Sequence, residues 1–120
     1  MIYESSININ GTEYPIVCNG YAVREIQNKF GKISNLGSVL TTDGEPNFSA
    51  ILDLATILLE AGQRYSKVVG KECPPPMKSW EDVIDITDMS ILETLLTTIS
   101  KGMTREVETV SKNGEAKQMN

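Results

Sequence analysis

The stretch from Asn47 to Arg64 constrains the fold of this chain most, because it has the densest apolar periodicity in the sequence. Apolar residues recur there at steps of three and four, which places them on one face of an α-helix. These residues are Phe48, Ile51, Leu52, Ala55, Leu58 and Leu59. Leu54, Ile57 and Ala61 widen this face, so we expect a central helix that is covered on more than one side. Asn47 is suited to cap its first turn, and Gly62 is suited to end it.

Length and composition predict a single globular domain. The 120 residues allow one hydrophobic core, and 40% of them are hydrophobic while 22% are charged. With a net charge of −5, the chain lacks the excess of basic residues that binding to nucleic acid usually requires. The chain has no secretory signal pattern, and its apolar runs are shorter than the roughly 20 residues of a membrane helix. We therefore expect a cytoplasmic protein with no membrane or nucleic-acid partner, whose two cysteines stay reduced.

The N-terminal residues 2–18 predict a β-hairpin. Alternating apolar residues stand on both sides of Asn10-Gly11, a pair that accepts the positive φ angles of a tight hairpin turn. Pro15 lies in the second predicted strand and cannot donate a backbone hydrogen bond, so this strand should lie at an edge. Such an edge also offers a route to self-association by strand addition.

Helices are expected to fill the chain from the hairpin to residue 103. They comprise residues 21–30 ending at Gly31, a brief helix over 36–40, the central helix, a continuation over 63–69 ending at Gly70, a short helix capped by Ser79, and a last helix beginning at Thr87 or Asp88. A turn over 41–46 precedes the central helix. Three consecutive prolines, Pro74 to Pro76, predict an extended strap that crosses the helices and is anchored by Trp80.

The predicted fold class is mainly α with a small N-terminal β-hairpin (α+β), as one compact domain over residues 1–103 with five to six helices. The last helix should bury a stripe of apolar residues, namely Leu92, Leu95, Leu96, Ile99 and Met103. Residues 104–120 are predicted to form a flexible C-terminal tail, because their few apolar residues are scattered among charges.

The residue types exclude the commonest catalytic arrangements. The chain contains no histidine, so neither a Ser-His-Asp nor a Cys-His arrangement can form. Its glycines do not form a phosphate-binding loop. Asp82, Asp85 and Asp88 recur every three residues, and we interpret them as helix caps and a solvated face. We predict no catalytic residue, cofactor or metal, and we expect Arg64 to pair with Glu60 or with a helix C-terminus.

A series of short motifs follows one order along the chain. The motifs are Asn10-Gly11 with Glu13-Tyr14-Pro15-Ile16, Ala22 with Ile26, Lys29-Phe30-Gly31, Ile57 to Gly62 with Arg64-Tyr65, Ile86-Thr87, and Lys101-Gly102. This order, which spans roughly Ile7 to Met103, resembles that of the tail assembly chaperones of long-tailed (siphovirus-type) bacteriophages and prophages, above all those of Gram-positive bacteria.

The resemblance implies a non-catalytic assembly protein that is absent from the mature virion. Such a protein would bind the helical tape measure protein in the cytoplasm of the bacterial host, keep it soluble, and help recruit tail tube subunits. We expect partner contact at the last helix and tail, with Leu95, Ile99, Met103, Val107 and Val110 as candidate residues. Burial in the protein's own core is the competing interpretation for Leu95, Leu96, Ile99 and Met103, and it is the one that the sequence favours. A homo-oligomer is a further expectation.

Two alternatives remain open from the sequence. One is a head–tail connector or tail-completion protein, which would be retained in the virion. The other is a small enzyme that holds a divalent metal ion with Glu81, Asp82 and Asp85.

Overall fold

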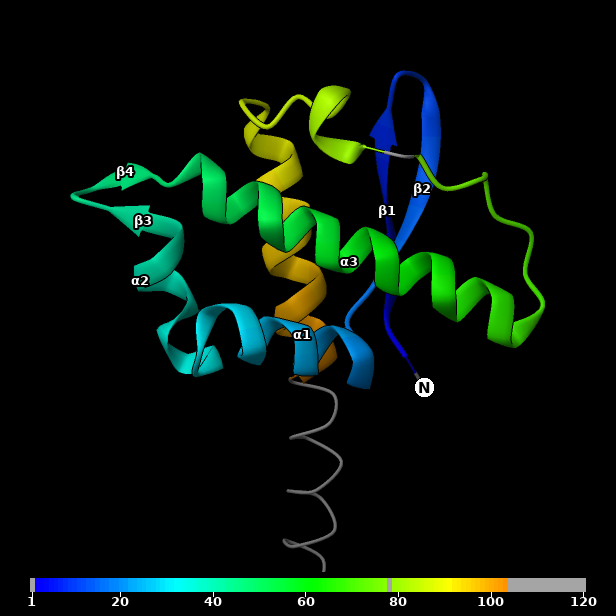
Figure 1. Cartoon of the computed structure of the whole chain (residues 1–120), viewed down its shortest axis with the longest axis horizontal. Helices are drawn as coiled ribbons and strands as arrows, with labels where there is room; N and C mark the ends of the chain where they lie inside the picture. Colours follow the sequence, from blue (N-terminus) through cyan, green and yellow to red (C-terminus); the bar gives the residue numbers. More distant parts are fainter. Residues whose placement is uncertain (1, 78, 104–120) are drawn as a thin grey trace, which may run out of the picture.

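The computed structural model of the protein describes residues 2–77 and 79–103, and within them the chain has an α+β fold with an N-terminal hairpin (Figure 1). The elements are β1 (Glu4–Ile9), β2 (Thr12–Val17), α1 (Gly20–Phe30), the 3₁₀ turn η1 (Ile33–Asn35), α2 (Leu36–Leu40), β3 (Thr41–Thr42), β4 (Glu45–Pro46), α3 (Phe48–Val69), the 3₁₀ turn η2 (Trp80–Asp82) and a last helix over 89–103.

Helix α3 forms the centre of the fold, as the sequence predicts. It crosses the whole molecule, passing in front of the last helix and reaching from the β3–β4 end to the N-terminal hairpin (Figure 1). Its apolar face is buried, and Leu54, Leu58 and Leu59 have no exposed surface. Elements on several sides of the helix therefore share one core, in which α3 packs against β2, α1, α2 and η2.

The N-terminus of α3 is capped by Asn47, whose side-chain Oδ1 accepts a hydrogen bond from the backbone N–H of Ala50 at 3.2 Å. This bond satisfies one of the four backbone donors that a helix start leaves without a partner. Replacing Asn47 by Ala is expected to lower the free energy of unfolding by about 1 kcal/mol. Urea unfolding of the two proteins measures the difference, and Asn47→Asp, which restores an acceptor, should recover most of it. An unchanged stability in Asn47→Ala would contradict the capping role.

Helix α3 does not end at Gly62, which corrects the sequence prediction. The helix runs on through the predicted continuation to Val69 and ends, as predicted for that continuation, at Gly70, whose φ of 73° lies in the left-handed region. Gly62 is buried within the helix because the backbone of β2 lies against it. A Cβ atom placed on Gly62 would overlap the carbonyl oxygen of Pro15 and lie 3.1 Å from the amide nitrogen of Ile16. The glycine is required by packing between two elements rather than by the end of a helix.

The hairpin has the register that its turn dictates. Asn10 and Gly11 both have positive φ, and they join the paired residues Ile9 and Thr12. In an antiparallel ladder closed by such a two-residue turn, hydrogen-bonded and non-hydrogen-bonded pairs alternate, so Pro15 opposite Ser6 falls on a non-hydrogen-bonded pair. Its missing N–H is thus not needed by β1, and its carbonyl points outward towards Gly62.

The five to six helices predicted from the sequence are four α-helices in the described residues. The central helix and its predicted continuation over 63–69 are one helix, and the segment after Ser79 forms only the 3₁₀ turn η2, without a side-chain cap. The predicted turn over 41–46 contains a second, two-stranded pairing of β3 with β4 around Asp43 and Gly44. The hairpin, the central helix and the last helix are confirmed.

Candidate functional site

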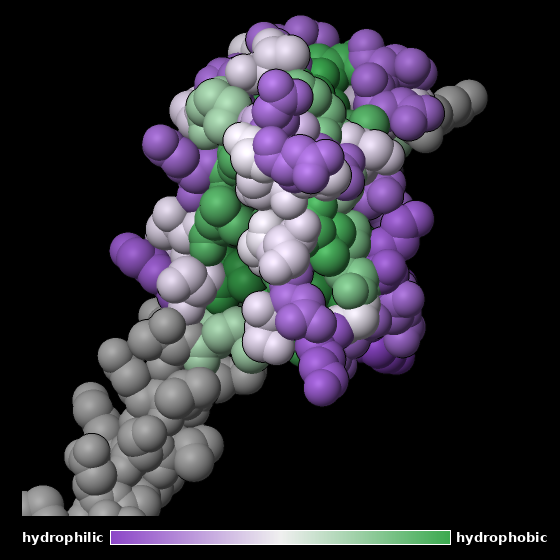
Figure 2. Space-filling model, turned by 90° about the vertical axis from the view of Figure 1, so that its left-hand side faces the viewer, coloured by the Kyte–Doolittle hydropathy of each residue, from purple (hydrophilic) through white to green (hydrophobic). Residues whose placement is uncertain are grey.

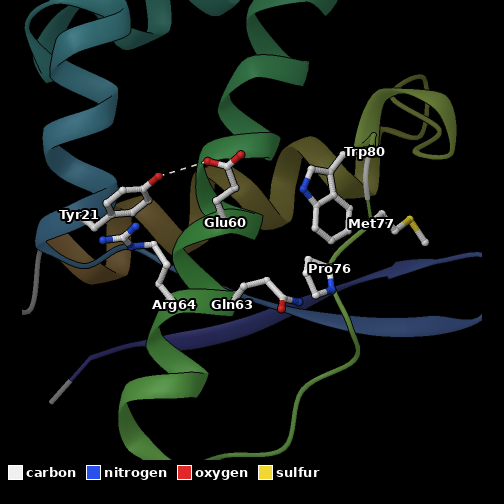
Figure 3. A pocket seen from close by; sticks show the side chains of 7 residues that line it. All are labelled: Tyr21, Glu60, Gln63, Arg64, Pro76, Met77 and Trp80. Carbon is white, nitrogen blue, oxygen red and sulfur yellow. Dashed lines mark hydrogen bonds between the residues drawn. The ribbon is translucent and has the colours of Figure 1, made fainter.

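A groove runs along the exposed face of α3, between α1 on one side and the segment from Pro76 to Glu81 on the other (Figure 3). It consists of two adjoining pockets of about 260 and 290 Å³ that share Glu60, Met77 and Trp80. The first is also lined by Tyr21, Gln63, Arg64 and Pro76, and the second by Asp53, Thr56, Ser79 and Glu81. The side chains that reach the groove from α3 belong to successive turns of the same helix face.

The proline strap forms one wall of this groove and is attached at three points. The Gln63 side-chain amide donates to the carbonyl oxygen of Pro74 at 2.9 Å, and Lys71 makes a 2.6 Å ion pair with Glu4. Trp80 is buried and packs edge-to-face on Tyr14 at a centroid distance of 5.1 Å. The predicted anchoring role of Trp80 is confirmed.

At the α1 side of the groove, Tyr21 lies between two charged side chains of α3 (Figure 3). Its hydroxyl donates to Glu60 at 3.2 Å, and the Arg64 guanidinium stacks over its ring with the Cζ atom 4.1 Å from the centroid. The predicted pairing of Arg64 with Glu60 is wrong, because Arg64 forms no ion pair within the described part of the chain. Partial burial raises the pKa of the Tyr21 phenol, and the neighbouring Glu60 carboxylate raises it further.

This arrangement makes the ionisation of Tyr21 a probe of the groove. Replacing Glu60 by Gln removes the negative charge that opposes phenolate formation, so the pKa of Tyr21 is expected to fall. The phenolate absorbance, taken as the difference between each protein and its Tyr21→Phe counterpart over a pH titration, measures the shift. Glu93→Gln on the last helix is the matched control. A Tyr21 titration that is the same with and without Glu60 would contradict the contact.

Two of the predicted cluster of acidic residues, Asp85 and Asp88, make local hydrogen bonds. Asp85 accepts hydrogen bonds from the backbone N–H and the hydroxyl of Thr87, and Asp88 accepts the same two from Ser90, which lowers the pKa of Asp88. Asp88 therefore caps the start of the last helix. Over residues 2–77 and 79–103, no group of three His, Cys, Asp or Glu side chains is placed to hold a metal ion.

The last helix has two distinct apolar faces. Its inner face, which comprises Ile91, Leu95, Thr98 and Ile99, is buried. The predicted partner residues Leu95 and Ile99 are 0% and 6% exposed, so in this structure they offer no surface to a partner. Met103 is half-buried against the core, whereas Val107 and Val110 lie outside the described residues.

The second face, which we call the outer band, consists of Met89, Leu92, Leu96 and Met103. Steps of three, four and seven residues keep these side chains in line on the helix, and the line adjoins the inner face, because Leu92 and Ile99 are seven residues apart and lie on the same side. Met89 is 47% and Leu96 41% exposed, whereas Leu92 and Met103 are half-buried and pack partly against the core. Hydrophobic residues reach the surface on the side of the molecule that Figure 2 shows.

Leu96 was predicted to belong to the buried stripe, but the polar Thr98 is fully buried instead. The Thr98 hydroxyl donates to the carbonyl oxygen of Thr94 at 2.7 Å, so it enters the core without an unsatisfied group. A stripe that begins at Ile91 would have matched the helix face that is buried in the structure, because Leu95 follows Ile91 by four residues and Thr98 follows Leu95 by three.

None of the helices in the described ranges is both long enough and apolar enough to span a bilayer. No known protein family matches the chain, and neither a curated protein nor a solved structure is detectably similar to it.

Proposed function

We propose that this protein is a non-catalytic tail assembly chaperone of a long-tailed bacteriophage or prophage. It binds the tape measure protein in the cytoplasm of the bacterial host, keeps it soluble, helps recruit tail tube subunits and is left out of the mature virion. The proposal rests first on the ordered motifs of the sequence, from Asn10-Gly11 to Lys101-Gly102, which resemble those of this class of protein.

The outer band is the structural observation that supports the proposal best. A protein that coats an apolar helix needs apolar surface that its own core does not use. Leu95 and Ile99 fix the last helix to the core, and this leaves Met89 and Leu96 exposed on an adjoining face. The predicted contact at Met103 belongs to the same band. Val107 and Val110 stay in the proposal, since they follow Met103 at steps of four and seven.

Co-expression with the tape measure protein encoded by the same phage or prophage tests the proposal. The expected result is that the tape measure protein becomes soluble and co-purifies with this chain, whereas without the chain it is recovered in the insoluble fraction. A tape measure protein that stays insoluble beside a well-folded chain would contradict the proposal. Finding the chain by mass spectrometry in purified virions would instead favour the connector alternative.

A further inference from the structure

We infer that the outer band binds one amphipathic helix whose apolar stripe is flanked by lysine or arginine residues. The inference deepens the proposed function, on which it rests for the identity of the natural partner, by stating the shape and the charge of the binding segment. The shape of the band and the charges along its borders carry the argument.

The shape of the band suits a helix. Met89 and Met103 are separated by fourteen residues, so the band is about 21 Å long at 1.5 Å per residue. It is a single line of side chains on a helix, whose backbone N–H and C=O groups are already paired within the helix, so an extended partner cannot be held there by strand pairing. A second helix laid along such a line can insert side chains spaced at three and four residues between those of the band.

The charges that border the band are negative. Glu93 is exposed and lies one helical turn from both Met89 and Leu96, so its carboxylate stands beside the band. Asp88, also exposed, stands at the N-terminal end of the band and accepts two hydrogen bonds from Ser90. Lys101 lies roughly a third of a turn or more around the helix from each residue of the band, and its Nζ is 5.2 Å from the centroid of the Tyr3 ring.

The β3–β4 hairpin carries two further negative charges. It stands on the side of the molecule that faces the viewer in Figure 2, and both of its charged residues, Asp43 and Glu45, are exposed acids. A partner helix with acidic flanks would bring like charges together, and so would a second copy of this chain docked through the same band. Basic flanks on another protein are the complement that the described surface favours.

Two synthetic helical peptides of about 20 residues test the inference with the full-length protein. Both carry the same leucine stripe, one with lysine flanks and the other with glutamate flanks. Fluorescence anisotropy of the labelled peptides is expected to show binding of the lysine peptide at least about tenfold tighter than that of the glutamate peptide. Equal affinity, or no binding of either peptide, would overturn the inference.

Matched substitutions separate docking on the band from general attraction to an acidic protein. Leu96→Glu and Val68→Glu each add one negative charge at an exposed apolar residue, and Val68 lies near the end of α3, away from the band. We expect Leu96→Glu to weaken binding of the lysine peptide about tenfold or more, and Val68→Glu to leave it unchanged. Equal effects of the two variants would overturn the inference.

Leu96→Ser keeps the test valid if Leu96→Glu disturbs the fold, because it removes the apolar side chain without adding a charge. Circular dichroism checks that both variants are folded.

The proposed function and this inference can fail independently of each other. If the tape measure protein co-purifies equally well with the wild type and with Leu96→Ser, the inference is wrong and the chaperone role stands. If the lysine peptide binds at the band but the tape measure protein does not co-purify, the chaperone role is wrong.

Discussion

Gly62→Ala is expected to destabilise the protein more than most single-methyl additions would. The added Cβ would overlap the carbonyl oxygen of Pro15, a backbone atom that no rotation of a side chain can move away. Either α3 or β2 must shift, and both are buried at this contact. We expect the free energy of unfolding to fall by about 3 kcal/mol or more, at or beyond the upper end for overpacked cores. Urea unfolding followed by circular dichroism measures this change.

Gly37→Ala is the matched control for this substitution. Gly37 lies in α2, is exposed, and has no atom within 4 Å of the position that a Cβ would take. Alanine there should leave stability unchanged or raise it by up to about 1 kcal/mol, because alanine favours a helix more than glycine does. If Gly62→Ala were as harmless as Gly37→Ala, the close approach of α3 to β2 would be wrong.

Leu58→Ala is expected to have a comparably large effect through the opposite change, the loss of volume. Leu58 is completely buried in the hydrophobic core that α3 shares with the other elements. Removing its side chain loses the transfer free energy and leaves a cavity that the surrounding elements can only partly close. The expected loss of stability is about 3 to 5 kcal/mol, measured by urea unfolding.

Leu96→Ala removes the same atoms from the outer band and serves as the comparison. Leu96 is 41% exposed, so the same truncation there should cost less than about 1 kcal/mol. A large loss in Leu96→Ala would show that the outer band contributes to the core, and would contradict its assignment as a surface for a partner.

The elements that could be predicted from the sequence are those fixed by local signals. Asn10 and Gly11 adopt the positive φ angles that the sequence implies, and the hairpin follows directly from them. The periodicity after Asn47 gives the central helix and most of its buried face correctly, although Phe48, which was predicted on that face, is 43% exposed and Leu52 is half-buried. These signals need no knowledge of what the segment packs against.

The errors occur where a distant contact decides the structure. Gly62 was taken as a helix end, and the reason for a glycine there is the backbone of β2. Gly102 also lies within a helix, and a Cβ on it would come within 3.1 Å of the Cβ of Cys18. A sequence pattern cannot distinguish a glycine that ends a helix from one that lets another segment of the same chain pack closely against the helix.

The groove could not be predicted for the same reason. Tyr21 and Arg64 come together only because α1 packs against α3, and nothing in the spacing of either residue indicates the other. The outer band could be predicted in part from the sequence, since its leucines belong to the same periodic segment as the inner face. Periodicity alone does not fix which of two adjoining apolar faces the core will cover.

The close packing of α3 against β2 also has a consequence for synthesis on the ribosome. The hairpin over residues 4–17 is made first, yet the helix that packs against its second strand is completed only when the chain reaches Val69. A two-stranded hairpin is marginally stable by itself in water. During translation the hairpin is therefore not stabilised until most of the domain has been made. If the ribosome paused before Gly62, the two strands would be exposed without the part of α3 that packs against them.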